Sequence, residues 1–156
     1  MTDAELTGLA ERIRQELDEL QRVLARIQEG WERARRSNDD YYLDGVALNL
    51  HGFYGGFERI FTHIAETIDD DLPHGEDWHR VLLRQMQNEI PGIRPAVIST
   101  KTVEILDELR KFRHIVRNVY THHLDPARLG KLVEGASGTF AQLKTEILAF
   151  VAFLEQ

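Results

Sequence analysis

The sequence predicts an all-α protein, an up-and-down bundle of four to five helices. Apolar residues recur at steps of three and four along most of the chain, the spacing that places them on one face of a helix. The chain has only 4 prolines in 156 residues, so long stretches contain no helix breaker. Alternation of apolar and polar residues between turn signals, the pattern typical of strands, does not occur.

The length predicts a single domain over residues 1–156. A domain of this size buries roughly 70% of the surface of its unfolded chain, so it needs no covalent staple. Cysteine is absent, which excludes disulfides and thiolate metal sites and fits a reducing compartment. The acidic N-terminus lacks the apolar core of a signal peptide, and no apolar run approaches the roughly 20 residues that span a membrane. We therefore expect a cytoplasmic protein.

The first two helices are marked by their ends and by their apolar stripes. Thr2 and Glu5 have the spacing of a capping box, which starts a helix that runs to about Trp31. A polar run at 37–40 breaks the chain, and a second helix covers about residues 41–68. The predicted core positions of these two helices are Leu6, Leu9, Ile13, Leu17, Leu20, Leu24, Ile27, Leu48, Phe53, Phe57, Ile60, Phe61 and Ile64.

Three glycines, Gly52, Gly55 and Gly56, lie inside the second helix. Each costs roughly 0.8–1.0 kcal/mol relative to alanine in a helix interior. They indicate either the close approach of another backbone or a local kink, and the usual use of glycine favours a tight helix crossing.

A loop at residues 69–75 and a third helix at about 77–89 follow. The loop begins with three consecutive aspartates, but adjacent side chains do not point at one ion, so we expect a solvated loop. His51 and His63 are too far apart in sequence to share a ligand spacing, and no metal site or cofactor is expected. The inward positions of the third helix, and of the proline-bounded connection that packs as a lid after it, are Trp78, Val81, Leu82, Met86, Ile93, Val97 and Ile98.

A fourth helix runs from the hydroxyl residues at 99–100 to about His122. The pair Asp125-Pro126 supplies the cap and the first position of a fifth helix, which Gly135 and Gly138 interrupt before a last apolar segment. The predicted core positions of this half are Val103, Leu106, Leu109, Phe112, Val116, Val119, Leu129, Leu132, Val133, Phe140, Leu143, Ile147, Phe150 and Val151.

The segment LRKFRHIVRNVYTHHLD, residues 109–125, differs in charge from the rest of the chain. The chain carries a net charge of -7, yet this segment has no acid before its last residue. Its cationic and imidazole side chains are Arg110, Lys111, Arg113, His114, Arg117, His122 and His123. An acidic protein with one such segment is expected to use it for an anionic ligand.

The spacing of these residues decides which of them can act together. Arg110, Arg113 (or His114) and Arg117 lie on neighbouring turns of the predicted helix and share a face. Arg117 and His122 are separated by roughly 140° of rotation on an ideal helix. They converge only if the helix ends just before His122, or if two chains combine their groups across a two-fold axis. A homodimer is therefore part of the expectation.

The run Arg117-Asn118-Val119-Tyr120-Thr121-His122 resembles the Arg, polar residue and His motif of the HEPN superfamily. The order of five helices, with the motif late in the chain, is similar to that of the HepT-like ribonuclease toxins. The resemblance covers most of the chain in helix order and length, while its specific part is this short run. It implies a metal-independent endoribonuclease that acts as the toxin of a toxin–antitoxin pair.

The resemblance also implies residue roles. Arg117 and His122 would be catalytic, with Asn118 as a polar helper, in a cleavage that uses the ribose 2′-hydroxyl as nucleophile. A histidine transfers protons near neutral pH, and an arginine fork binds phosphoryl oxygens. The expected RNA-binding residues are Arg110, Arg113, His114, Thr121 and His123.

Two features depart from the family pattern. Toxins of this kind that pair with nucleotidyltransferase antitoxins often carry a tyrosine two residues after the motif histidine, where the partner adds AMP. Here that position is Leu124, and Tyr120 is the nearest substitute. The identity of an antitoxin, of nucleotidyltransferase type or another, stays open. The net charge of -7 also opposes non-specific RNA binding, so contact is expected only at the basic helix.

Other interpretations stay open. His122 or His123 can serve as the cation that is favoured at a helix C-terminus, and His114 as a structural hydrogen-bonding residue. Arg110 and Lys111 can pair with acids one turn earlier. The competing functions are a non-catalytic HEPN-like interaction module, as an antitoxin or partner-binding protein, and a plain bundle whose basic helix binds an acidic protein.

Overall fold

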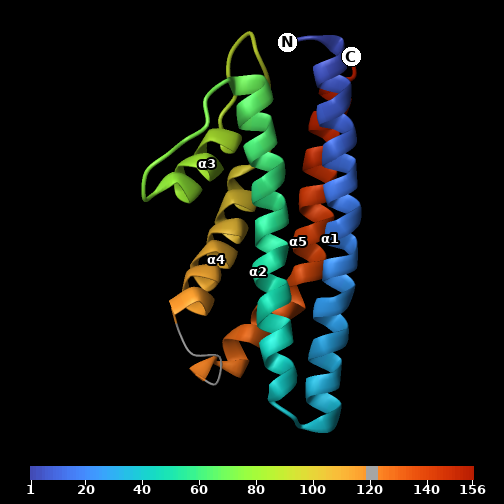
Figure 1. Ribbon diagram of the computed structural model, residues 1–156, viewed down its shortest axis with the longest axis vertical. Helices are drawn as coiled ribbons and strands as arrows, with labels where there is room; N and C mark the ends of the chain where they lie inside the picture. The colour runs from blue at the N-terminus through green and yellow to red at the C-terminus, as the bar shows by residue number, and fades with distance from the viewer. Residues whose placement is uncertain (119–122) are drawn as a thin grey trace.

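The computed structural model describes residues 1–118 and 123–156, whose regular elements are the helices of an all-α bundle (Figure 1). The helices are α1 (Asp3–Ser37), α2 (Tyr41–Ile64), a π-helical turn η1 (Ala65–Asp69), α3 (Trp78–Gln87), α4 (Thr100–Asn118) and α5 (Pro126–Leu154). Helix α1 packs on α2 and α5, while α4 packs on α2 and α3. In Figure 1 α2 therefore lies between the α1–α5 pair and the shorter α3 and α4.

The predicted start of α1, the break at 37–40 and the predicted cap of α5 are confirmed, whereas α1 continues past its predicted end at about Trp31 and ends at Ser37. The Glu5 backbone N–H donates to Thr2 Oγ1 at 3.1 Å and the Thr2 N–H donates to Glu5 Oε2 at 2.6 Å, which completes the capping box. The break at 37–40 places Asn38 in the left-handed region, with φ 52°. Asp125 caps α5 by accepting from the Ala127 N–H at 3.0 Å. These are local interactions, which explains why the sequence shows them.

The apolar stripes form one core, with three exceptions. Leu48, Val81 and Ile93 were predicted to face inward, and all three are exposed. Leu48 lies on the rim of an open cavity between α1 and α2, and Val81 lies on the short helix α3, which packs on α2 and α4. The two other residues of the predicted lid, Val97 and Ile98, are buried. Val119 lies outside the described residues.

Helix α5 is continuous, so the predicted interruption at Gly135 and Gly138 is wrong. Both glycines lie within the helix, and a Cβ added at either would meet nothing within 4 Å. Their cost of roughly 1 kcal/mol each is small against the burial of the apolar stripe on both sides. Tertiary packing therefore keeps α5 helical at both glycines.

The tight crossing predicted in α2 occurs at one glycine. A Cβ on Gly56 would lie 2.4 Å from Leu20 Cδ2 of α1, whereas one on Gly52 would meet nothing within 4 Å. A second close approach, which the sequence did not indicate, brings the Trp31 ring to 2.9 Å from a Cβ built on Gly130 of α5. Helix α1 thus packs closely on both α2 and α5, at a glycine of each partner.

The loop after α2 is not simply solvated, as the sequence had indicated. The Asp69 side chain is 2% exposed and forms a two-pronged ion pair with Arg94, whose side chain is 0% exposed, at 2.6 and 2.8 Å. Arg94 also donates to the carbonyls of Gln85, Asn88 and Pro95. This network fixes α3 and its connection against the end of α2.

None of the helices among the described residues is long and apolar enough to cross a membrane.

Candidate active site

The basic face of α4 opens onto one cavity. The cavity has a volume of about 400 Å³, and its lining residues are Glu76, His79, Arg110, Arg113, His114 and Arg117. Four of the six come from α4 at three- and four-residue steps, which confirms that they share a face. The other two come from α3 and the segment before it. The packing of α3 on α4 thus completes a cavity that α4 begins.

The three arginines of the cavity differ in how their charge is balanced. Arg110 Nε donates to Asp107 Oδ1 at 2.8 Å, and Lys111 lies 3.4 Å from the same carboxylate. Burial alone would raise the pKa of Asp107, but the hydrogen bond and charge of Arg110, together with Lys111, lower it. The proposed pairing of these two cations with acids one turn earlier is therefore confirmed. Arg117 is exposed, and no acid of the described residues pairs with it.

Helix α2 supplies polar groups that hold Arg113 at the side of the cavity. Arg113 Nε donates to His51 Nε2 at 3.1 Å, and its Nη1 lies 3.9 Å from Glu58 Oε1. Burial and the charges of Arg113 and Arg117 lower the pKa of His51, so this imidazole is neutral when it accepts from Arg113. Arg113 is consequently oriented by two side chains of a neighbouring helix.

Glu58 connects this arginine to a histidine of α3. Glu58 is 9% exposed at its side chain, and its Oε2 lies 2.5 Å from His79 Nδ1. Next to it, the Tyr54 hydroxyl is buried without a well-formed hydrogen bond among the described residues. Burial, and then the nearby Glu58 charge, raise the pKa of Tyr54, which keeps the phenol neutral.

The structure describes only part of the predicted site. Arg110, Arg113, His114 and Arg117 are brought together, whereas exposed His123 is not among the residues that line the cavity. Asn118 is the last residue of α4. The predicted site residues outside the described ranges are Tyr120, Thr121 and His122. Leu124 has no hydroxyl to be modified, and its side chain is partly buried against the core.

Sequence reasoning missed His51, Glu58, Glu76 and His79. One signal was available, because Glu58 lies one turn from buried Tyr54 and Phe61 on the same face of α2. An acid on a buried stripe needs a partner, and that partner had to be sought elsewhere in the chain. The described residues contain no cluster of three or more histidine and acidic side chains able to hold a metal ion, and the expectation of no metal rests on the sequence alone.

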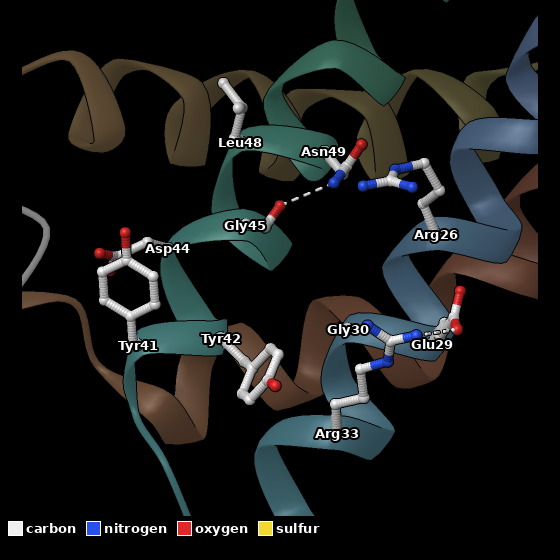
Figure 2. Close-up of a pocket in the computed structure, with 10 residues that line it drawn as sticks. All are labelled: Arg26, Glu29, Gly30, Arg33, Tyr41, Tyr42, Asp44, Gly45, Leu48 and Asn49. Carbon is white, nitrogen blue, oxygen red and sulfur yellow. Dashed lines mark hydrogen bonds and ion pairs between the residues drawn. The ribbon is translucent and has the colours of Figure 1, made fainter.

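A second cavity, of about 440 Å³, lies between α1 and the start of α2 (Figure 2). Tyr41 and Leu48 stand exposed on one side of it, and Arg33 on the other side pairs with Glu29 at 2.7 Å. Asn49 Nδ2 donates to the Gly45 carbonyl at 2.8 Å, which engages its amide within α2. None of its lining residues is a histidine, so the α4 cavity is the better candidate for proton transfer near neutral pH.

Comparison with known families gives one finding. A family model described as HepT-like protein matches residues 45–154, which span α2 to α5 and include the whole lining of the α4 cavity. No curated protein and no solved structure gives a significant match.

Proposed function

This chain belongs to the HepT-like protein family, and from that premise we propose that it is a metal-independent endoribonuclease of the HEPN type. The observation that carries the proposal is the convergence of Arg110, Arg113, His114 and Arg117 on one open cavity. Guanidinium groups match the oxygens of a phosphodiester in geometry and charge. Imidazoles supply proton transfer at the same place.

The reaction uses groups that the chain itself offers. The ribose 2′-oxygen attacks the adjacent phosphorus, the bond from phosphorus to the 5′-oxygen breaks, and the products are a 2′,3′-cyclic phosphate and a 5′-hydroxyl. Arg117, which no acid of the described residues neutralises, stabilises the charge on the phosphoryl oxygens. His122 transfers a proton, and Asn118 orients the phosphate beside it.

The charge of the chain limits where RNA binds. A net charge of -7 repels a polyanion from most of the surface, so contact is restricted to the α4 cavity and its rim. Affinity for RNA should then fall only modestly with salt, because few phosphates are contacted. Such a restricted footprint suits an enzyme that cuts exposed loops of RNA better than one that coats a strand.

The biological role within this proposal is that of a toxin, active as a homodimer and held inactive by an antitoxin. A dimer would bring two copies of His122, and with them two sources of proton transfer, to one cleft. An antitoxin that acts by transferring AMP to a tyrosine would need Tyr120, because Leu124 occupies the other position and is partly buried. Any different antitoxin would act by covering the cavity.

The test is cleavage of total bacterial RNA by the purified chain in the presence of EDTA. We expect the wild type to cleave, and Arg117→Ala and His122→Ala to slow cleavage by about 10²–10³-fold or more. Arg22→Ala is the matched control, because Arg22 is an exposed α1 residue paired only with Glu19. Intact RNA with the wild type, or equal rates for the wild type and Arg117→Ala, would contradict the proposal.

A non-catalytic interaction module is the competing function, and one observation favours it. Arg110 and Arg113 are already engaged within the chain, by Asp107 and by His51 and Glu58. A module of this kind predicts partner capture without turnover. Induced expression in a bacterial host separates the two, since only an active nuclease makes growth depend on Arg117.

A further inference from the structure

We propose that His79 of α3 is the general base of this site and that Glu58 of α2 is the residue that positions it. The inference deepens the proposed ribonuclease function and rests on it. It assigns to one protomer a proton acceptor that the sequence motif does not contain.

The contact between the two residues defines which ring nitrogen is available. Glu58 Oε2 lies 2.5 Å from His79 Nδ1, and the Glu58 side chain is 9% exposed. An ionised carboxylate only accepts, so Nδ1 must carry the hydrogen of this bond. The lone pair of the neutral ring is then on Nε2, which the described residues leave without a partner. A carboxylate that fixes the tautomer of an imidazole in this way is the arrangement of a general base.

His79 is also held in orientation and placed at the cavity. Its ring lies on the Trp78 ring with centroids 3.7 Å apart, and it lines the same cavity as Arg117. Glu58 reaches both sides of the site, because its other oxygen lies 3.9 Å from Arg113 Nη1. One buried carboxylate thus fixes the imidazole relative to a guanidinium, which is the relation that a base needs to a phosphate held by arginine.

Charged and titratable groups surround this imidazole from three elements. Those in or beside the cavity are Glu58 and His51 of α2, Glu76 before α3, and Asp107, Arg110, Arg113, His114 and Arg117 of α4. Asp107 and Glu58 balance Arg110 and Arg113, so Arg117 is the guanidinium that draws an anion into the cavity that His79 lines.

The proposed step conserves atoms and charge. Nε2 of His79 takes the proton of the 2′-hydroxyl as the 2′-oxygen forms its bond to phosphorus and the 5′-oxygen leaves. The leaving 5′-oxygen takes a proton from a separate acid, for which His122 is the proposed group. After each turnover, His79 returns its extra proton to solvent and His122 takes up a proton from solvent.

The first experiment compares pH–rate profiles under single-turnover conditions with a labelled RNA that the wild type cuts at one mapped position. We expect His79→Gln to slow cleavage by about 10²–10⁴-fold and to flatten the acidic limb of the profile. Glu58→Gln should slow cleavage less than His79→Gln, and in the double variant the two effects should combine to much less than their product, since most of the effect of Glu58 is exerted through His79. His63→Gln is the matched control, because His63 lies on α2 but does not line the cavity.

The second experiment identifies the role of the proton. The same RNA is made with sulfur in place of the 5′-bridging oxygen at the cut, a leaving group that needs no protonation. Loss of a general acid is then rescued and loss of a general base is not. We expect His122→Ala to recover on this substrate and His79→Gln to stay slow.

The outcomes separate this inference from the proposed function. Cleavage by His79→Gln at the wild-type rate and pH profile, or its rescue by the sulfur substrate, would overturn the base assignment and leave the ribonuclease intact. Absence of cleavage by the wild type would overturn both. If circular dichroism shows that His79→Gln is unfolded, the Glu58→Gln/His79→Gln double variant takes its place in the same measurements, because it leaves no unpaired buried charge.

Discussion

At the scale of single residues, burial and charges on other helices lower the pKa of two histidines of α2. His51 accepts a hydrogen bond from Arg113 and stays neutral because burial and two arginine charges lower its pKa. His63 lies farther along α2, where burial and Arg12 lower its pKa too. Both therefore bind protons less readily in the folded than in the unfolded chain.

Stability should consequently fall on acidification. Below the ordinary histidine pKa of 6.5 the unfolded chain takes up protons at these two sites that the folded chain does not, so the free energy of unfolding falls as pH drops through this range. We expect urea denaturation to give a lower free energy of unfolding at pH ~5.5 than at pH ~7.5. The His51→Gln/His63→Gln double variant should lose less over the same interval, and an equal loss would refute the assignment.

Two glycines of α2 test how closely this helix packs on α1. Gly56→Ala should destabilise the fold by about 1–3 kcal/mol, because its Cβ would lie 2.4 Å from Leu20 Cδ2 in a filled core. Gly52→Ala, where nothing lies within 4 Å, should stabilise the helix by roughly 0.8–1.0 kcal/mol. Thermal unfolding of both variants tests the pair, and the same sign for both would show that the crossing at Gly56 is absent.

At the scale of elements, the short helix α3 matters because it carries His79 into the cavity. Its position is set by its buried residues Leu82, Leu83 and Met86 and by the Asp69–Arg94 pair, which joins η1 to the connection after α3. Gln85 of α3 also donates to Asp69 at 2.7 Å, so the helix is tied to the same carboxylate.

Loss of the Asp69 carboxylate should destabilise the fold. Asp69→Ala leaves the Arg94 guanidinium buried and unpaired, which should lower the free energy of unfolding by about 3–5 kcal/mol. Asp71→Ala is the matched control, since Asp71 is an exposed aspartate two residues away and should change stability by no more than about 0.5 kcal/mol. Chemical denaturation checks both, and a small effect at Asp69 would mean that the pair is not buried.

At the scale of the whole molecule, charge is partitioned. Acids dominate the chain as a whole, but the α4 cavity gathers three arginines, of which one has no acidic partner among the described residues. This contrast confines any polyanion to one place. If catalysis needs two copies of His122, the site at the α4 cavity is incomplete within one protomer.

We therefore expect the active form to be a homodimer. Native mass spectrometry should give a mass of twice the 18.0 kDa chain at the concentrations at which RNA is cleaved. Dilution below the dimer dissociation constant should lower cleavage per chain, because the shared cleft is lost. A monomer with undiminished cleavage would refute the composite cleft and would fit a site in which one protomer supplies both base and acid.

The number and order of the helices, their caps and most of the buried positions follow from the sequence. Each of these depends on residues within about one turn of one another, as in the Thr2–Glu5 box or the shared face of Arg110 and Arg113. The errors arose where tertiary packing opposes a local rule. Gly135 and Gly138 lie within a helix that is stabilised by its buried neighbours, and Leu48 is exposed because no helix of the described part of the chain covers it.

Only the tertiary structure places Glu58 against His79, which are 21 residues apart on different helices, and His51 against Arg113, which are 62 apart. No periodicity or motif encodes such contacts, because they depend on how α2, α3 and α4 pack together. The amino-acid sequence therefore specifies a bundle with a basic helix and a HepT-like motif. The packing of three helices turns that basic helix into one wall of a cavity with an oriented imidazole.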